Sequence, residues 1–454
     1  MVAALFISLL ILLVLGVPVF VSLGLSSLIA VAGFSDFPLM IIVQRMIGGV
    51  DKFSLMAIPF FILAANVMKT GGIARRILDW AGCMVGHQRG GMAVTTEVAC
   101  MFFGAVSGSS PATVLAIGGL TYPKMVEQGY PKSFSTGLIT SSGSVALLIP
   151  PSISAIVYCS VTGASVGALF MAGLGAGLLY GICFLLYCIW YAKKHNIPKA
   201  PKTSGRERWK ITKDAAWALG VPVIIIGGIY AGIFTPTEAA GVSAVYAIIV
   251  SLFIYKEMSL KQLWECCVAS AGTTAQVMIL LAAASAFGYV LTIGQVPQML
   301  SALIVNADLS RVGFLLMVNL LMILEGMFID GSSAIIITAP LLYNAALGLG
   351  IDPVHFGVIM VANAAIGMFT PPFGLNLFVA QPVTGNNIKD IMKGVLPFVA
   401  IAIFALMLIT YIEPVSMISR VCSTVDHPFP TKAEDPQGGL PLSFTAITAK
   451  CIKL

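Results

Sequence analysis

Two short runs of glycine and serine have the residue types and spacing to bind ions. The first, SGSSPAT, begins at Ser107, and the second, DGSSAII, begins at Asp330. Each run is followed about forty residues later by two adjacent prolines, Pro150–Pro151 and Pro371–Pro372. Because a proline lacks a backbone N–H and clashes with the carbonyl one turn earlier, each pair should break a helix. A broken helix offers carbonyl groups that can replace the water shell of a cation such as Na⁺, and free N-termini that attract an anion.

Small polar residues gather around each run and each proline pair. The residues suited to the first site are Ser107, Gly108, Ser109, Ser110, Gly143 and Ser144. Those suited to the second site are Gly331, Ser332, Ser333, Gly367, Thr370 and Gly374. For any one of them, close packing of small residues between helices is an equally good explanation. The prediction therefore rests on the recurring group and not on a single residue.

Three acidic residues lie in apolar surroundings, where such groups mark functional sites or face polar cavities. Asp330 is the strongest candidate because it adjoins the second glycine-serine run. Glu97 and Glu325 are equally well explained by hydrogen bonds to neighbouring backbone. Glu238 has a structural explanation, since TPTEAA predicts a capping box in which Glu238 pairs with Thr235.

The composition is that of a membrane protein with many spans. Of 454 residues, 58% are hydrophobic and 10% are charged, and the mean hydropathy is +0.97, well outside the range of soluble domains. A membrane helix needs about 20 apolar residues. The first apolar run should be one retained helix, because it lacks the basic start and the cleavage site of a signal peptide. The expected spans are residues 2–34, 53–69, 134–158, 165–191, 215–234, 239–255, 273–293, 355–381 and 394–412.

Cysteines and charges exclude some functions and set the topology. The nine cysteines include no CxxC pair, so we expect neither a metal centre nor disulfides. The formal charge of +6 comes mainly from short loops between spans, so a nucleic-acid partner is not expected. The most basic segment, KKHNIPKAPKTSGRERWK, identifies residues 193–213 as a cytoplasmic linker, and counting crossings outward from it places most Lys and Arg residues inside.

Two stretches are too short on either side of a break to hold full crossings. Residues 91–122 are interrupted by SGSSP and residues 313–350 by DGSS, so each should form a re-entrant hairpin, one from each side of the membrane. With the broken helices at 134–158 and 355–381, they give an arrangement that occurs twice in opposite orientation. This is the pattern of an inverted-repeat secondary transporter. The expected organisation is a first repeat at 1–192, the linker at 193–213, a second repeat at 214–413 and a tail at 414–454.

These residues resemble the large membrane subunit of tripartite ATP-independent periplasmic (TRAP) transporters of the DctM-like type. The resemblance covers residues 1–413 and rests on IPFFILAANVMKTGGIARRI, GAVSGSSPATVLAIGGLTYPKMVEQGY, GSVALLIPPS, GIFTPTEAAGVSAVYA, GIDPVHFGVIM and IGMFTPPFGLNLFV. It implies an all-α, polytopic, inverted-repeat elevator, in which a transport domain carrying both hairpins slides against a scaffold, coupled to Na⁺.

The resemblance also implies partners and a location. The partners would be a separate small four-helix membrane subunit and a periplasmic binding protein. That protein would deliver a carboxylate such as a dicarboxylate, a keto acid or sialic acid, and the complex would lie in the bacterial inner membrane. The tail at 414–454 departs from the family, whose members usually stop soon after the last helix, and we expect it to be disordered or weakly packed.

The family motifs assign some of the candidate residues to two Na⁺ sites. The first Na⁺ site would use Ser107, Ser110, Gly143 and carbonyls just before Pro150, and the second would use Gly331, Gly367, Thr370 and nearby carbonyls. Substrate binding is expected from Ser109, Ser144, Asp330, Ser332 and Gly374.

Three other functions fit parts of the sequence. An intramembrane serine protease could use VSGSS as its nucleophile loop, but a buried serine needs a nearby histidine base, and the four histidines lie in expected loops, at a span end or in the tail. A channel would need a pore ring, which nothing in the sequence resembles. A stand-alone Na⁺/anion symporter of the same elevator superfamily is the strongest alternative.

Overall fold

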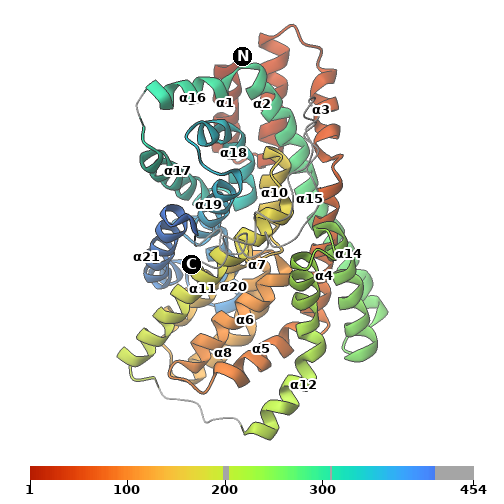
Figure 1. The fold of residues 1–454 in the computed structure, drawn as a ribbon, viewed down its shortest axis with the longest axis vertical. Helices are drawn as coiled ribbons and strands as arrows, with labels where there is room; N and C mark the ends of the chain where they lie inside the picture. The colour runs from red at the N-terminus through yellow and green to blue at the C-terminus, as the bar shows by residue number, and fades with distance from the viewer. Residues whose placement is uncertain (198–203, 307–308, 415–454) are drawn as a thin grey trace, which may run out of the picture.

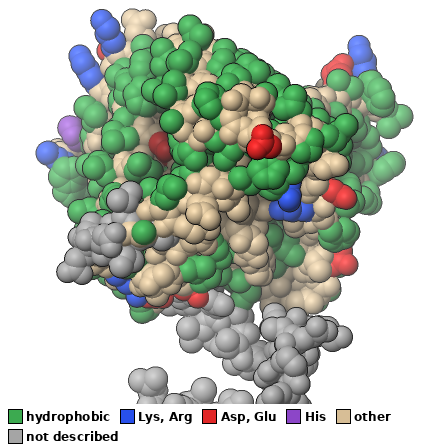
Figure 2. Space-filling model, turned by 90° about the horizontal axis from the view of Figure 1, so that it is seen from above, with side chains coloured by type: hydrophobic (Ala, Val, Ile, Leu, Met, Phe, Trp, Pro, Cys, Tyr) green, Lys and Arg blue, Asp and Glu red, His purple; other side chains and the backbone are tan. Residues whose placement is uncertain are grey.

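The computed structural model describes residues 1–197, 204–306 and 309–414. Within these ranges the regular structure is helical, which confirms the prediction of an all-α polytopic membrane protein. Figure 2 shows one end of the molecule, much of which is covered by hydrophobic side chains. Among the described residues, seven segments are long and apolar enough to cross a membrane: Phe53–Thr70, Val166–Lys194, Gly205–Tyr230, Pro236–Ile254, Leu260–Ile293, Gly331–Gly348 and Ile388–Tyr411. Apart from Pro414, the expected tail lies outside the described residues, as does part of the linker.

The first apolar run is two helices, α1 (Val2–Val14) and α2 (Val19–Phe34), so the prediction of one retained helix is wrong. Gly16 has a φ of +76°, which ends α1, and Pro18 lacks the N–H that a continuous helix requires. The two helices pack against each other.

Other expected spans differ from the observed helices mainly at their ends. α15 (Leu260–Ile293) begins well before residue 273, because Ser259 and Gln262 form a capping box. Much of the linker is helical, since α11 (Val166–Lys194) runs into it and α12 (Gly205–Pro222) begins inside it. The capping box predicted at the start of α14 (Pro236–Ile249) is present.

Both expected hairpins form pairs of helices. In the first, α6 (Gly91–Ser107) turns at Gly108, and the chain returns through α7 (Ser110–Thr113), η2 (Val114–Gly118) and α8 (Gly119–Glu127). Gly108 has a φ of +56°, and a Cβ added there would lie 2.6 Å from the carbonyl oxygen of Pro151, so the tip requires glycine. The second hairpin consists of α17 (Arg311–Gly326) and α18 (Gly331–Gly348).

Both proline pairs interrupt helices, as the sequence predicts. α9 (Lys132–Ser142) continues as the short 3₁₀ helix η3 (Gly143–Leu147) and ends before Pro150, and α10 (Ile153–Thr162) follows the break. In the second half, α19 (Pro353–Gly367) ends before Pro371, and α20 (Leu375–Thr384) follows. Both Pro-Pro peptide bonds are cis.

The helices form two bodies. We call α6–α11 and α17–α21 the hairpin body, and α1–α4 with α12–α15 the frame. Figure 1 shows the frame along one side of the molecule and the hairpin body along the other, with the connecting helices α5 and α16 near opposite ends. The remaining helices of the two bodies and their connections are α3 (Met40–Val50), η1 (Phe53–Met56), α4 (Ala57–Thr70), α5 (Ile73–Val85), η4 (Val223–Gly227), α13 (Gly228–Tyr230), η5 (Val250–Ile254), α16 (Val296–Asn306) and α21 (Ile388–Tyr411).

The two repeats exchange packing partners inside the hairpin body. The half-helix α9 packs on α21, the last helix of the second repeat, and α19 packs on α11, the last helix of the first. Likewise α10 packs on the second hairpin at α18, whereas α20 packs on the first hairpin at η2. This reciprocal packing brings each hairpin tip to the broken helix of the other repeat.

Candidate functional site

A polar contact joins the first hairpin tip to the second broken helix. Asn376, which is fully buried, donates from Nδ2 to Ser110 Oγ at 2.7 Å and to the carbonyl oxygen of Thr140 at 3.0 Å. The bond to Thr140 fixes the orientation of the Asn376 amide, because a carbonyl oxygen can only accept and so must face the amide nitrogen. The other amide atom, Asn376 Oδ1, is buried and accepts no hydrogen bond within the described part of the chain. An acceptor oxygen is therefore held between the two repeats.

The second tip makes the mirror contact with the first broken helix. Ser332 Oγ at the start of α18 lies 3.4 Å from Ser154 Oγ at the start of α10. Both serines lie just after a helix break or hairpin turn, like Asn376 and Ser110 at the first tip. The sequence predicted Ser110 and Ser332 as site residues, and each makes a contact between repeats.

The first tip brings together three of the residues predicted for the first Na⁺ site. Ser107 Oγ lies 2.9 Å from Thr113 Oγ1, whose hydroxyl donates to the carbonyl of Ser109 at 2.9 Å. A Cβ added to Gly143 would lie 2.9 Å from the carbonyl oxygen of Ser110, so glycine lets η3 approach the tip closely. The oxygen atoms near the first tip are therefore hydroxyl and carbonyl oxygens.

Ser144 is turned away from this tip. Its hydroxyl donates to the carbonyl of Ser141 at 2.7 Å and lies 3.0 Å from the hydroxyl of Tyr180 on α11. These bonds hold η3 against α11, so the structure explains Ser144 by packing within the hairpin body.

The second break is lined by the residues predicted for the second site. Thr370 donates its hydroxyl to the carbonyl of Ile366 at 2.7 Å and accepts the N–H of Gly374 at its own carbonyl at 3.1 Å. A Cβ added to Gly374 would lie 2.7 Å from the carbonyl oxygen of Met368. Several carbonyl oxygens thus crowd around the bend between α19 and α20.

Asp330 is a helix cap. Its carboxylate accepts the backbone N–H groups of Ser332 and Ser333, each at 3.1 Å, and the Ser333 hydroxyl. A carboxylate at the N-terminus of α18 satisfies free amides and interacts favourably with the helix dipole. The cap accounts for Asp330 without a ligand.

Gly331 and Gly367 place the second hairpin against the broken helix. A Cβ on Gly331 would lie 3.0 Å from the Cβ of Ala364 on α19, and one on Gly367 would lie 2.5 Å from the Cα of Gly326 on α17. These glycines therefore set the distance between backbones.

Sequence reasoning missed the asparagines. Asn376 joins the two repeats, and Asn363 on α19 donates from Nδ2 to Asn319 Oδ1 on α17 at 2.7 Å. All three are buried. The available signal was an amide inside an apolar run, because such a group must find a partner when it is buried.

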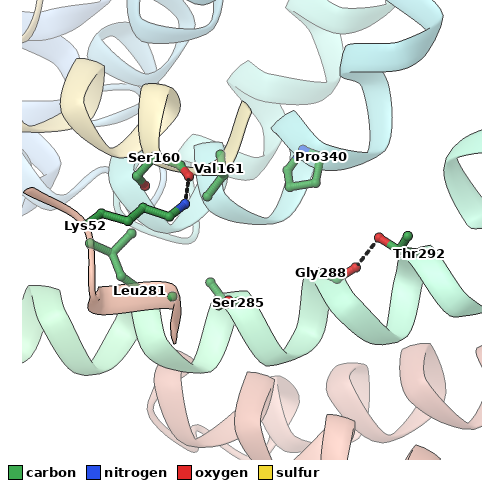
Figure 3. A pocket seen from close by; sticks show the side chains of 10 residues that line it. Lys52, Ser160, Val161, Leu281, Ser285, Gly288, Thr292 and Pro340 are labelled. Carbon is green, nitrogen blue, oxygen red and sulfur yellow. Dashed lines mark hydrogen bonds between the residues drawn. The ribbon is translucent and has the colours of Figure 1, made fainter. Parts of the chain in front are cut away.

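A cavity of about 190 Å³ separates the frame from the hairpin body. Figure 3 shows Lys52 of the frame extending to the carbonyl of Ser160, near the end of α10, and donating a hydrogen bond to it. A cation is favourable at the C-terminal end of a helix, where carbonyls are unpaired. Lys52 thus connects the frame to a half-helix of the hairpin body. The cavity is lined by Gly49, Lys52, Ser160, Val161, Leu281, Ala284, Ser285, Gly288, Thr292 and Pro340.

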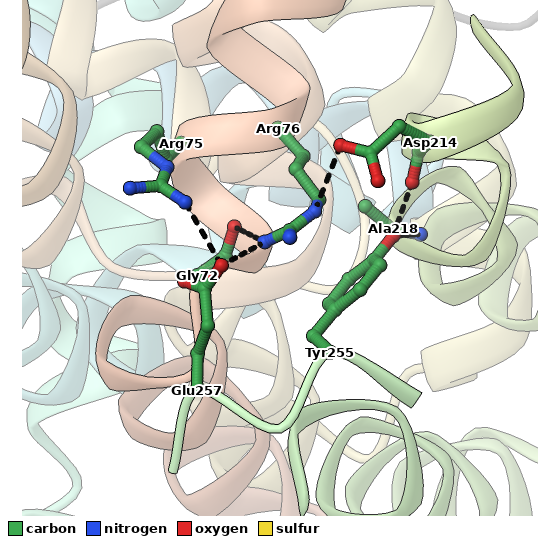
Figure 4. Close-up of polar contacts among 7 residues, drawn as sticks. All are labelled: Gly72, Arg75, Arg76, Asp214, Ala218, Tyr255 and Glu257. Atoms are coloured by element: carbon green, nitrogen blue, oxygen red, sulfur yellow. Dashed lines mark hydrogen bonds and ion pairs between the residues drawn. The ribbon is translucent and has the colours of Figure 1, made fainter. Parts of the chain in front are cut away.

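A cluster of ion pairs connects α5 to the frame. Arg76 forms ion pairs with Asp214 on α12 at 3.1 Å and with Glu257 before α15 at 2.9 Å, and Arg75 pairs with Glu257 at 2.8 Å (Figure 4). The Arg76 guanidinium also lies 3.7 Å from the ring centroid of Tyr255. Since α5 packs on α6, this helix connects a point fixed in the frame to the first hairpin.

Comparisons with known proteins point to one family. The family model described as "Tripartite ATP-independent periplasmic transporter, DctM component" matches residues 6–415. A C4-dicarboxylate TRAP transporter large permease protein, DctM, of Rhodobacter capsulatus is 43% identical over 88% of this chain and 94% of that protein. The isethionate TRAP transporter permease protein DctMQ of Oleidesulfovibrio alaskensis is also 43% identical, over 89% of this chain and 64% of that longer protein.

A solved structure supports the fold. The YdaH transporter of Alcanivorax borkumensis superposes with a TM-score of 0.59 over 86% of this chain and 97% of that chain, at 15% sequence identity. Identity at this level supports the shared fold and nothing finer.

Proposed function

This chain belongs to the DctM family of tripartite ATP-independent periplasmic transporters, and we propose that it moves an organic acid across the bacterial inner membrane together with Na⁺. Members of the family are permease subunits and not enzymes. The observation that carries the proposal is the pair of reciprocal contacts, Asn376 with Ser110 and Ser154 with Ser332, which place both hairpin tips against broken helices.

Na⁺ would be held at the two helix breaks. The predicted ligands at the first break are Ser107, Ser110, Gly143 and carbonyls before Pro150, and those at the second are Gly331, Gly367, Thr370 and nearby carbonyls. The residues fit this ion, because Na⁺ prefers hydroxyl and carbonyl oxygens and because Asn376 Oδ1 is a buried acceptor without a donor among the described residues. When bound, Na⁺ would supply positive charge next to which a carboxylate is stable.

The substrate would lie between the two tips. Ser109 and Ser332 are only half-buried, so their hydroxyls can reach a ligand from opposite hairpins. Ser144, Asp330 and Gly374 complete the predicted substrate set, although Ser144 and Asp330 already have partners within the protein.

The two bodies support an elevator mechanism. The hairpin body would slide past the frame, with α5 and α16 as its connections and the Lys52 hydrogen bond to Ser160 as a contact that must break during the movement. α5 is anchored by Arg76, so its first turn would stay with the frame.

The partners proposed are a small four-helix membrane subunit and a periplasmic binding protein. The binding protein would make the first selection of the carboxylate. Relatives of equal identity are named for a C4-dicarboxylate and for isethionate, so identity does not choose the substrate. A stand-alone Na⁺/anion symporter, the alternative, would need neither partner.

The experiment is uptake into vesicles that contain this chain and its small subunit. We expect uptake only with an inward Na⁺ gradient and with the binding protein present. Equal uptake with K⁺ in place of Na⁺ would contradict the coupling, and Na⁺-driven uptake without the binding protein would favour the symporter.

Replacing Ser110 or Thr370 with Ala should raise the Na⁺ concentration needed for half-maximal uptake by about tenfold, because each hydroxyl is a proposed ligand. The control is Ser243→Ala, which removes a fully buried hydroxyl from α14 in the frame. An unchanged Na⁺ response in both the Ser110 and the Thr370 variants would mean that carbonyl groups alone bind the ion.

A further inference from the structure

Glu97 on α6 is a buried carboxyl that neither the Na⁺ sites nor the substrate site uses. Its side chain is fully buried, and neither of its oxygens has a hydrogen-bond partner among the described residues. Ser142, the last residue of α9, faces Glu97 without reaching hydrogen-bonding geometry, and its hydroxyl is also buried and has no hydrogen-bond partner in the part of the chain that the structure describes. A buried carboxyl without partners costs far more to keep ionised than neutral.

The second repeat has positions equivalent to Glu97 and Ser142, and two close helix contacts identify them. Gly104 on α6 packs against Ala146 of η3, with a Cβ on Gly104 2.8 Å from the Cα of Ala146. In the second repeat, Gly326 packs in the same way against Gly367, at 2.7 Å. These two contacts align α6 with α17 and η3 with the end of α19.

In this alignment, Glu97 in the first repeat is equivalent to Asn319 in the second repeat, and Ser142 is equivalent to Asn363. Glu97 lies about two helical turns before Gly104, and Asn319 lies the same distance before Gly326. In the second repeat the two amides bond directly, Asn363 Nδ2 to Asn319 Oδ1 at 2.7 Å. The second repeat thus has two neutral amides that bond to each other at this position, whereas the first repeat has a group that can change its charge.

We propose that Glu97 is a proton-binding site in the hairpin body, and that its proton passes to water when a cation binds at the first helix break. Ser142 directly precedes Gly143, so a negative charge on Glu97 would stabilise a cation at that break. The second part of the proposal rests on the proposed Na⁺ coupling.

No competing charge surrounds Glu97 within the residues that the structure describes. The titratable groups that face it within the described chain are Cys100 on α6 and Tyr180 and Cys188 on α11. The other elements packed against α6, which are α4, α5, α7, η2, α8, α9, η3 and α12, present no charged described side chain that acts on it. No nearby charge would therefore offset a change in the charge of Glu97.

Infrared spectroscopy of the purified protein tests the proton site directly. The difference spectrum of wild type minus Glu97→Gln should contain the C=O band of a protonated carboxyl, and this band should weaken when Na⁺ replaces K⁺. Glu325→Gln is the matched control, because Glu325 accepts the Thr338 hydroxyl at 2.5 Å and should not give the Na⁺-sensitive band. Absence of the carboxyl band from wild type minus Glu97→Gln would overturn the proposal and leave the Na⁺ coupling untouched.

The pH dependence of uptake tests the linkage. In wild type, acid should raise the Na⁺ concentration needed for half-maximal uptake by up to about tenfold per pH unit, as expected when one proton competes with one cation. Glu97→Gln should need the same Na⁺ concentration at every pH, close to the value of wild type in acid. Ser142→Ala should retain the pH dependence and shift the infrared band. A Glu97→Gln variant with the pH profile of wild type would contradict the linkage.

Discussion

Asn376→Ala should reduce substrate uptake by about a hundredfold, because it removes two buried hydrogen bonds and the acceptor oxygen between the repeats. The lost donor bonds are those to Ser110 at 2.7 Å and to Thr140 at 3.0 Å. Asn376→Asp should be similarly impaired, since it keeps the shape but cannot donate to the Thr140 carbonyl. The measurement is the initial rate of Na⁺-driven uptake in reconstituted vesicles, with the amount of folded protein determined by size-exclusion chromatography.

The matched control is Ser154→Ala at the mirror contact. The Ser154 to Ser332 distance of 3.4 Å is longer, and both partners are hydroxyls that can reorient, so this change should cost much less uptake. Wild-type uptake by Asn376→Ala would show that the contact between repeats is not part of the transport site.

Gly367→Ala should destabilise the protein by about 3 kcal/mol, at the upper end of the cost of overpacking. The added Cβ would lie 2.5 Å from the Cα of Gly326 and 2.9 Å from its carbonyl carbon, and neither backbone atom can rotate away. Helices α17 and α19 would have to separate. The thermal unfolding midpoint in detergent should fall by several degrees.

Gly348→Ala provides the control for this change. Gly348 also lies in a helix of the second hairpin, but a Cβ there would meet nothing within 4 Å. Alanine should be neutral or slightly stabilising at this position, because it loses less backbone entropy than glycine in a helix. If both variants unfold at the wild-type temperature, the close approach of α17 and α19 does not matter for stability.

The breaks and hairpins could be predicted from the sequence because proline and glycine act locally. Pro150 and Pro371 interrupt their helices wherever they lie in the fold, and Gly108 allows a left-handed turn without help from neighbours. The same reasoning, applied to Gly16 and Pro18, would have divided the first apolar run into α1 and α2. The prediction of one retained helix considered only the missing features of a signal peptide.

The site partners could not be predicted in this way, because they come from distant parts of the chain. Asn376 is 266 residues from Ser110, and the amide alone does not reveal which repeat will satisfy it. Ser144 matches the predicted pattern, but its hydroxyl bonds to Tyr180 because η3 packs on α11. Asp330 adjoins a tip, yet its carboxylate is used by the amides of its own helix.

The measurement that tests the account most directly is thiol labelling of the two hairpin tips. Ser109→Cys and Ser332→Cys would be made separately in a protein without the nine native cysteines, and membrane-impermeant reagents would be applied from one side at a time. The inverted arrangement predicts that Cys at 109 reacts from the cytoplasmic side and Cys at 332 from the periplasmic side, at rates that change with Na⁺ and substrate. Labelling of both tips from the same side would contradict the inverted repeat and the ion sites built on it.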